Sequence, residues 1–475
     1  MKIIRLCLLI LFSQILYTSC SKKTIEGDLV ITNVNVIDVE KGMTNSYQTV
    51  AIKKGQIVSI SKHSSSDNIN SDSIIDGSGK FLMPALWDMH VHYTTSEEHK
   101  GFLNLFITNG VLGVRDLWGN LKSRDYIDST NVLAPEIYLS GAIIDGPFTL
   151  LNGSLQPRNK EEAIILVDSL HKAGADFIKV YDDLSQDIYS AIAKRCKELD
   201  MPFVGHVPLS VKATKASEMG QKSMEHLNGI WKSSTNDVAE IDSLETAFKS
   251  HFLSNDIESA IKTFTNINSK FNSEFNKETV VKLAKKLKEN KTYVTPTLIT
   301  IDRNWSRIDG TYKNQDNNKY VPESLLQEWD PELNFPSKMY PVETWNIGKE
   351  LLNTSLKITK ILHDNGVPIL AGTDCGVAYV IPGFSLHDEL ELFTKAGLSN
   401  SDALKTATIN PAMYFNLEHN SGKVAIAMNA NLLLLDKNPL LDISNTQTIS
   451  GIIKDGEYLN RKKLDELLEN AIYKN

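Results

Sequence analysis

Apolar and polar positions alternate with two different periods along this chain. Near both ends, short runs rich in β-branched residues are interrupted by Gly-containing turns, a pattern typical of antiparallel strands. These runs occupy residues 29–39, 49–60, 422–437 and 451–459. They predict one small β-sandwich domain assembled from both chain ends, residues 24–80 and 415–475.

The pattern changes in the middle of the chain, where short apolar stretches alternate with segments of helical period. Helices are predicted at 160–174 and 187–200. The candidate strands lie within 81–91, 110–118, 136–144, 176–182, 202–207, 223–229, 292–300 and 368–375. Eight strands with intervening helices predict an α/β fold, a (β/α)8 TIM barrel over residues 81–414.

The last part of the predicted barrel is longer than its strands require. Only two strand-to-helix steps are spread over residues 226–374, so much of this stretch exceeds ordinary connections. The surplus falls at about 230–290, which has helical periodicity, and at about 301–341, which is polar and aromatic. Insertions after barrel strands lie over the catalytic face, so we expect walls or lids of a pocket; the alternative is surface decoration.

Composition and charge exclude several classes of protein. The chain has 475 residues with 41% hydrophobic content, enough for a large core and unlike a disordered chain. Its net charge of -8 is spread along the sequence without a basic stripe, so a nucleic-acid partner is not expected. A homo-oligomer is compatible with this composition.

The N-terminus has the features of an export signal. Lys2 and Arg5 precede an apolar stretch, and small residues lead to Cys20. We expect residues 1–20 to be a lipoprotein-type signal peptide, with a lipid on Cys20 anchoring the protein to a membrane and facing the periplasm or cell surface. Plain cleavage and a retained anchor are the alternatives. The two remaining cysteines, Cys196 and Cys375, do not make a disulfide framework and are expected to be free and buried.

Two histidines one residue apart end the first predicted barrel strand. His90 and His92 point to the same side of an extended strand and can converge on one ion. Further candidates stand at or near later strand ends, where barrel active sites are built: Lys179, His206, His226 and Asp374. One such residue alone is more often structural, but the set in barrel order indicates a metal site.

The sequence segments around these residues resemble those of a known family. The segments are GKFLMPALWDMHVHY, GADFIKVY, GHVP, MEHL, AGTDCG, ATINPAMYFNL and DKNPLLDISNT. They are similar to the amidohydrolase superfamily, in its imidazolonepropionase-like and prolidase-like branch. The resemblance runs from Leu29 to about Gly456.

The resemblance implies a metal-ligand set. By analogy with binuclear members, two divalent metals are expected, as zinc or as manganese, cobalt or iron, with CO2 bound as a carbamate on the lysine. One metal would be held by His90, His92 and Asp374, the other by His206 and His226, and the carbamate on Lys179 would bridge them. A site with one metal and Lys179 as an ordinary amine is the alternative.

The resemblance also implies a reaction. A hydroxide bridging the metals would attack a carbonyl, and Asp374 would take its proton. Related deaminases carry a Glu shortly after the histidine that matches His206, and this chain has none there. We therefore expect hydrolysis of a C-N amide bond in a dipeptide, as in an Xaa-Pro dipeptidase, or in another small amide. A cyclic amidase or lactonase and a non-catalytic surface binding protein are the alternatives.

Three residues are candidates for substrate contact. Tyr181 follows Lys179 on the same strand face and could bond a substrate carbonyl or carboxylate, or be a packed aromatic. Arg115 could pair with a substrate carboxylate or with a structural acid. His387, at a predicted helix start, is expected at the pocket rim or on the surface.

Overall fold

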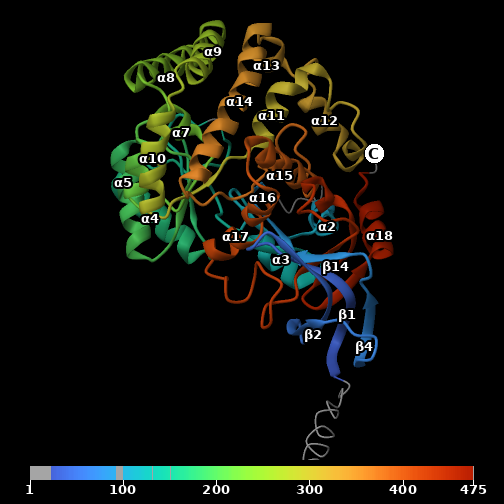
Figure 1. Cartoon of the computed structure of the whole chain (residues 1–475). Coiled ribbons are helices and arrows are strands. Elements are labelled where there is room, and N and C mark those ends of the chain that lie inside the picture. Colours follow the sequence, from blue (N-terminus) through green and yellow to red (C-terminus); the bar gives the residue numbers. More distant parts are fainter. Residues whose placement is uncertain (1–22, 93–99, 131, 150, 474–475) are drawn as a thin grey trace, which may run out of the picture.

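The computed structural model describes residues 23–92, 100–130, 132–149 and 151–473, and Figure 1 shows their arrangement. A β-rich end lies at one pole, and an α/β body lies above it. The predicted signal peptide and Cys20 lie outside the described residues.

Strands from both chain ends form one sheet. Its order is β15-β14-β13-β5-β1-β2-β3, and β4 also pairs with β1. The strands are β1 (Thr24–Asp38), β2 (Met43–Lys53), β3 (Gln56–Lys62), β4 (Asn68–Asp76), β5 (Phe81–Pro84), β13 (Leu432–Leu435), β14 (Ile449–Lys454) and β15 (Glu457–Asn460). The four leucines of β13 are all fully buried between β5 and β14, so the C-terminal segment is central to this sheet.

The apolar run at residues 81–91 is divided between two sheets. Its first part, β5, pairs with β1 and β13 in the sheet of the chain ends. Its second part, β6 (Leu86–Val91), belongs to the α/β body. The prediction of one barrel strand over the whole run is therefore wrong, because the sheet partners change at Ala85.

The α/β body contains two parallel sheets whose strands follow chain order. The first is formed by β6, β7 (Val111–Asp116) and β8 (Glu136–Leu139). The second contains β9 (Ile178–Val180), β10 (Phe203–Gly205), β11 (Ser223–Glu225) and β12 (Tyr293–Thr295).

Isolated bridges connect the two sheets where the ladder is interrupted. Ile144 pairs with Val180, Val294 with Ile369, and Val91 with Cys375, all in parallel. The predicted eighth strand, 368–375, is thus present only as the bridges of Ile369 and Cys375 among the described residues. The α/β class and the strand order are confirmed, whereas no continuous ladder among the described residues closes a barrel.

Helices separate the strands of the body. The predicted helices at 160–174 and 187–200 correspond to α4 and α5, each capped at its start by a side chain, Asn159 or Ser185. The bounds are α2 (Lys100–Thr108), α3 (Lys122–Thr130), α4 (Lys160–Lys172), α5 (Gln186–Glu198), α6 (Ala213–Glu218), α7 (Asn228–Ser233), α14 (Val342–Asp364), α15 (Phe384–Ala396), α16 (Asn400–Thr406), α17 (Ile409–Tyr414) and α18 (Arg461–Ala471).

The two predicted insertions fold differently. Residues 230–290 form the helices α8 (Val238–Leu253), α9 (Ile257–Ser273) and α10 (Lys277–Glu289), and α8 and α9 make a hairpin at one corner of the molecule (Figure 1). Residues 301–341 contain most of α11 (Leu298–Ser306), the 3-10 turns Arg307–Asp309 and Asp316–Tyr320, α12 (Glu323–Trp329) and α13 (Phe335–Lys338). Below, these are called the first and the second insertion.

Both cysteines of the described chain, Cys196 and Cys375, are free and buried, as predicted. Within the described ranges, no helix has both the length and the apolar character needed to span a bilayer.

Candidate metal centre

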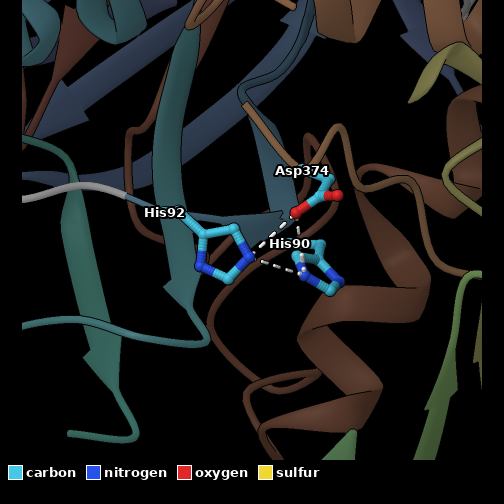
Figure 2. A group of neighbouring side chains, drawn as sticks. All are labelled: His90, His92 and Asp374. Atoms are coloured by element: carbon cyan, nitrogen blue, oxygen red, sulfur yellow. Dashed lines mark hydrogen bonds and ion pairs between the residues drawn. The ribbon is translucent and has the colours of Figure 1, made fainter. Parts of the chain in front are cut away.

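The histidine pair and Asp374 converge as Figure 2 shows. His90 lies in β6, His92 directly follows it, and Asp374 comes from the segment that bridges to β6. The two Nε2 atoms are 3.3 Å apart, and Asp374 Oδ1 lies 3.3 Å from that of His90 and 2.8 Å from that of His92. Two imidazoles and a carboxylate in this arrangement are a suitable set of ligands for one divalent cation.

The other predicted ligands border the same space. His226 follows β11, and its ring centre is 4.4 Å from that of His90 and 4.8 Å from that of His206. Its Nδ1 lies 3.9 Å from Asp374 Oδ2. Lys179, in β9, lines the cavity together with these residues. The structure therefore gathers all six predicted ligand positions at the C-terminal ends of the parallel strands.

Three of the four imidazoles are oriented by a hydrogen bond on Nδ1. The partners are Glu225 for His90 at 3.1 Å, Asp182 for His206 at 2.9 Å and Thr297 for His226 at 2.7 Å. Such partners hold the ring and leave Nε2 free for a ligand.

Three buried nitrogens of residues that border the cavity have no hydrogen-bond partner in the part of the chain that the structure describes. They are Nδ1 of His92, Nε2 of His206 and Nζ of Lys179. Because an unsatisfied buried polar atom is costly, a bound cation or carbamate would account for the last two. The residues present therefore fit a metal centre with a modified lysine.

Burial sets the protonation of these groups. It lowers the pKa of His90 and, strongly, that of His226, so both imidazoles are neutral, the form that binds metals. Burial also lowers the pKa of Lys179 to about 8, against the opposing effect of Glu225 and Asp374. An appreciable fraction of neutral amine is then present near pH 8, and the neutral amine is the form that combines with CO2.

Glu225 is a functional residue that the sequence analysis missed. It is fully buried one position before His226, and its carboxylate bonds both His90 and the guanidinium of Arg115. Burial opposes its ionisation, but the Arg115 charge outweighs this and holds the pKa of Glu225 well below its usual range. Glu225 and Ser223 lie two residues apart on the same, inner face of β11. This spacing of two polar side chains in a short strand was the signal in the sequence that could have identified Glu225.

Arg115 has a structural role and does not reach the cavity. Its guanidinium donates to Met89 O at 2.7 Å, to Ser223 Oγ at 2.7 Å and to Glu225. The prediction that Arg115 contacts the substrate is therefore wrong. Its alternative, a structural ion pair, is what the structure shows. The side chain is completely buried, with the ring of Tyr414 in α17 4.9 Å from its guanidinium.

His387 also lies away from the cavity. It is buried in α15, with Nδ1 2.9 Å from Thr446 Oγ1 and Nε2 3.1 Å from Asn109 O. The expectation that it rims the pocket, and its surface alternative, are both wrong. The helix turns this residue towards the end of α2 and the C-terminal segment, where two hydrogen bonds satisfy the ring.

A cavity of about 390 Å³ opens above the metal ligands. Its floor is formed by His92, Lys179, Tyr181, His206, His226 and Asp374. Tyr181 stacks on His206 with ring centres 3.9 Å apart, and burial raises the pKa of its phenol well above the usual value. The hydroxyl is thus protonated at neutral pH; Tyr181 lines the cavity, and its contact with a substrate stays a prediction.

The backbone is strained at two floor residues. His226 and Asp374 have φ angles of 61° and 57°, in the left-handed region that non-glycine residues rarely adopt. Such strain is concentrated at functional sites, where the surrounding structure maintains it. Here it turns both side chains towards the cavity at the ends of their segments.

Comparisons with solved structures agree with this architecture. A bottromycin amidohydrolase superposes with a TM-score of 0.70 at 20% identity, over 93% of this chain and 89% of that one. An Xaa-Pro dipeptidase with methionine bound in its active site gives a TM-score of 0.63 at 18% identity, over 91% and 99% of the two chains. At these identities the likeness concerns the fold.

Sequence relatives match over shorter segments. A dihydroorotase of Carboxydothermus hydrogenoformans is 38% identical over 91 residues, 18% of this chain and 20% of that protein. An adenine deaminase of Clostridium perfringens is 24% identical over 204 residues, 38% and 33% of the two chains. The chain thus spans a third or less of the length of these curated relatives.

A family profile covers most of the α/β body and the C-terminal strands. The amidohydrolase family matches residues 133–459, which include Lys179, His206, His226 and Asp374. This match exceeds half of the chain, and the fold and the side-chain arrangement agree with it. The chain belongs to the amidohydrolase family.

Proposed function

We propose that this protein is a metal-dependent hydrolase that cleaves a C-N amide bond in a dipeptide or another small amide. The convergence of His90, His92 and Asp374 beneath a cavity is the observation that carries the proposal. The unpartnered nitrogens of His206 and Lys179 support a second cation beside the first. A closed (β/α)8 barrel around these residues is part of the same proposal.

The ligand assignment follows the side-chain positions. His90, His92 and Asp374 would hold one divalent ion, zinc or a similar metal, and His206 and His226 the other, with Lys179 as a bridging carbamate. Bound cations supply a Lewis acid and lower the pKa of water towards neutrality. The partners Glu225, Asp182 and Thr297 keep the imidazoles in place for this purpose.

Two side chains would handle the reacting atoms. Asp374 Oδ2 accepts a proton from the attacking water and delivers it to the leaving nitrogen, which must be protonated before it departs. The protonated hydroxyl of Tyr181 donates a hydrogen bond to the carbonyl oxygen as negative charge develops there. Both groups line the cavity.

Metal content and one conservative variant test the proposal. The chain from Ser21 onward, purified with bicarbonate present, is expected to hold two divalent ions per chain by elemental analysis. Asp374→Asn should lower kcat by roughly 10²- to 10⁴-fold with metal still bound, because the proton carrier is lost. Full turnover by this variant would refute the assigned role. Cyclic amides and lactones serve as comparison substrates, and preferential turnover of either would replace the linear amide.

We also propose that the protein is exported and anchored by a lipid on Cys20. The charged, apolar and small residues that precede this cysteine support the assignment. The intact mass of protein isolated from membranes should reveal a lipid-modified N-terminus at Cys20. Cys20→Ala should release the protein from the membrane, and an unmodified mass would refute anchoring.

A further inference from the structure

The wall of the cavity has a different character from its floor. Above the metal ligands, apolar side chains come from α2, from the segments that follow β7 and β8, and from α12. They are Phe102, Trp118, Ile143, Leu151, Leu325 and Trp329. Trp118 reaches the metal ligands directly, with its ring edge-on to His92 at 6.2 Å between centres. A group that enters the cavity is therefore surrounded by hydrocarbon up to the reacting centre.

The second insertion supplies the outer part of this wall in a fixed position. Trp329 is 6% exposed, and its ring lies 5.6 Å from that of Tyr379, in the loop that follows Asp374. Arg307 donates to Trp329 O at 3.4 Å and to Ser337 Oγ at 3.1 Å, which ties the end of α12 to α13. The placement of Trp329 is thus coupled to the loop that carries the proton acceptor.

Two nearby cations are paired with acids outside the cavity: Arg303 bonds Asp302 and Asp388, and Lys313 bonds Asp330 and Glu332. Arg307 forms no ion pair among the described residues, but it is held by Trp329 O and Ser337 Oγ and does not line the cavity. Arg115 is enclosed with Glu225, as described above. Among the lining residues that the structure describes, the basic side chains are Lys179 and the histidines of the floor, all of them assigned to metal binding.

This distribution of charge bears on the substrate. A free carboxylate in the wall region would lose its hydration without gaining a counter-charge from the described lining residues, which is expensive. A neutral group that is aromatic or branched loses little hydration free energy when it enters the cavity, and it gains free energy by burying apolar area. The cavity volume lies near the lower end of the range of small-molecule sites, roughly 300 to 1,000 Å³, which suits one such group beside the scissile amide.

We propose that the substrate is an uncharged, apolar carboxamide, with Leu325 and Trp329 of the second insertion as the residues that select it. This inference rests on the proposed function and narrows it, because it disfavours free dipeptides within the wider class of small amides. The aromatic or branched substituent lies against the wall, and the amide carbonyl lies over the floor.

A matched pair of substrates tests this selection. N-(3-methylbutyl)phenylacetamide and phenylacetyl-leucine contain the same scissile bond and differ by one carboxylate. With metal-loaded enzyme, the neutral amide should have a kcat/KM at least about tenfold higher, chiefly through KM. Equal or better hydrolysis of phenylacetyl-leucine would overturn the inference while leaving amide hydrolysis intact.

Variants of the wall identify the selecting residues. Trp329→Ala should raise KM for the neutral amide about tenfold or more, because the apolar contact is lost. Leu325→Arg should shift the preference towards phenylacetyl-leucine by supplying a counter-charge. The control Leu333→Ala, at a site 58% exposed in the same insertion, should leave both constants unchanged. An unaltered preference in Leu325→Arg would contradict the assignment.

Binding separates this inference from the proposed function. Calorimetry on metal-loaded Asp374→Asn measures the affinity of both compounds without turnover. If wild-type enzyme hydrolyses neither compound yet the variant binds the neutral amide at least about tenfold more tightly, amide hydrolysis fails and the apolar selection stands. Equal affinities, tighter binding of the acid, or no binding of either compound would overturn the selection.

Discussion

The floor and the wall of the cavity are built by different means. The floor consists of polar side chains at the ends of successive strands. Its imidazoles His206 and His226, and the adjoining His90, are each held by a hydrogen bond to a neighbouring side chain. The wall consists of apolar side chains from helices and connections, held by packing. Strand geometry thus determines the chemistry, and the connections determine what can reach it.

The two insertions sharpen this difference. Leu325 and Trp329 of the second insertion line the cavity, whereas none of the described residues of the first insertion does. The hairpin of the first insertion packs on α14 through a separate apolar cluster that includes Ile241, Ile267, Phe271 and Leu351. An insertion in the same part of the chain can therefore shape the active site or leave it untouched.

Removal of the lysine from the floor should have the largest effect. In Lys179→Ala, metal content is expected to fall from two ions to one per chain, and kcat by roughly 100-fold or more, because the bridging ligand is lost. Elemental analysis and steady-state kinetics measure both, and added acetate or propionate should restore part of the activity. The control Lys222→Ala removes a partly buried lysine just before β11 and should keep both metals. Two ions retained in Lys179→Ala would contradict the bridge.

The second-largest effect is expected from Glu225, whose carboxylate supports His90 beneath the floor. Glu225→Gln removes the charge that orients His90, and metal affinity or activity should fall about 10- to 100-fold. The variant also leaves Arg115 as an unpaired buried charge, which should lower the free energy of unfolding by about 3 to 5 kcal/mol. Metal titration and thermal unfolding measure the two effects.

A double variant separates positioning from stability. Arg115→Met in the Glu225→Gln background removes the unpaired charge, so unfolding stability should recover in part. Metal affinity should stay low, because His90 still lacks the carboxylate charge on its hydrogen-bond partner. If affinity recovers together with stability, Glu225 has only a structural role.

An aromatic residue of the first insertion should affect stability alone. Phe271 is 6% exposed and stacks near Trp231, so Phe271→Ala should cost about 3 to 5 kcal/mol of unfolding free energy. Because Phe271 does not line the cavity, kcat/KM measured well below the unfolding temperature should stay within about twofold. The matched variant Trp329→Ala, at an equally buried residue, should cost a similar free energy of unfolding and should in addition lower kcat/KM. A large loss of kcat/KM in Phe271→Ala would show that the first insertion influences the active site, which would contradict this prediction.

The smallest effect is expected from His387, outside both floor and wall. Burial lowers its pKa from 6.5 to about 4, so the folded state disfavours the proton that the unfolded chain binds. Its contribution to stability is complete above pH 6.5 and is lost as the pH falls towards 4, up to about 3 kcal/mol. Thermal unfolding across this range should show a weaker acid dependence in His387→Gln than in wild type. The exposed His419→Gln should behave as wild type, and an unchanged profile in His387→Gln would refute this role.

Much of the site was predictable because its geometry is local. In parallel strands taken in chain order, carboxyl ends lie at one edge, so strand-end residues such as His206 and Asp374 had to approach one another. The pair His90 and His92 followed from the two-residue period of a strand. The helix of residues 160–172 followed from its apolar spacing and from its Asn159 cap.

What the sequence determined by itself was therefore the order of elements and the identity of the strand-end side chains, since both depend on neighbours within a few residues. The partner of Arg115, the burial of His387, the change of sheet at Ala85 and the unequal roles of the two insertions were decided by the tertiary structure alone. Each depends on which distant segment packs against the residue: Glu225 lies 110 positions from Arg115, and Thr446 lies 59 from His387. Periodicity reports which face of an element is buried, but only the folded chain supplies the surface that buries it.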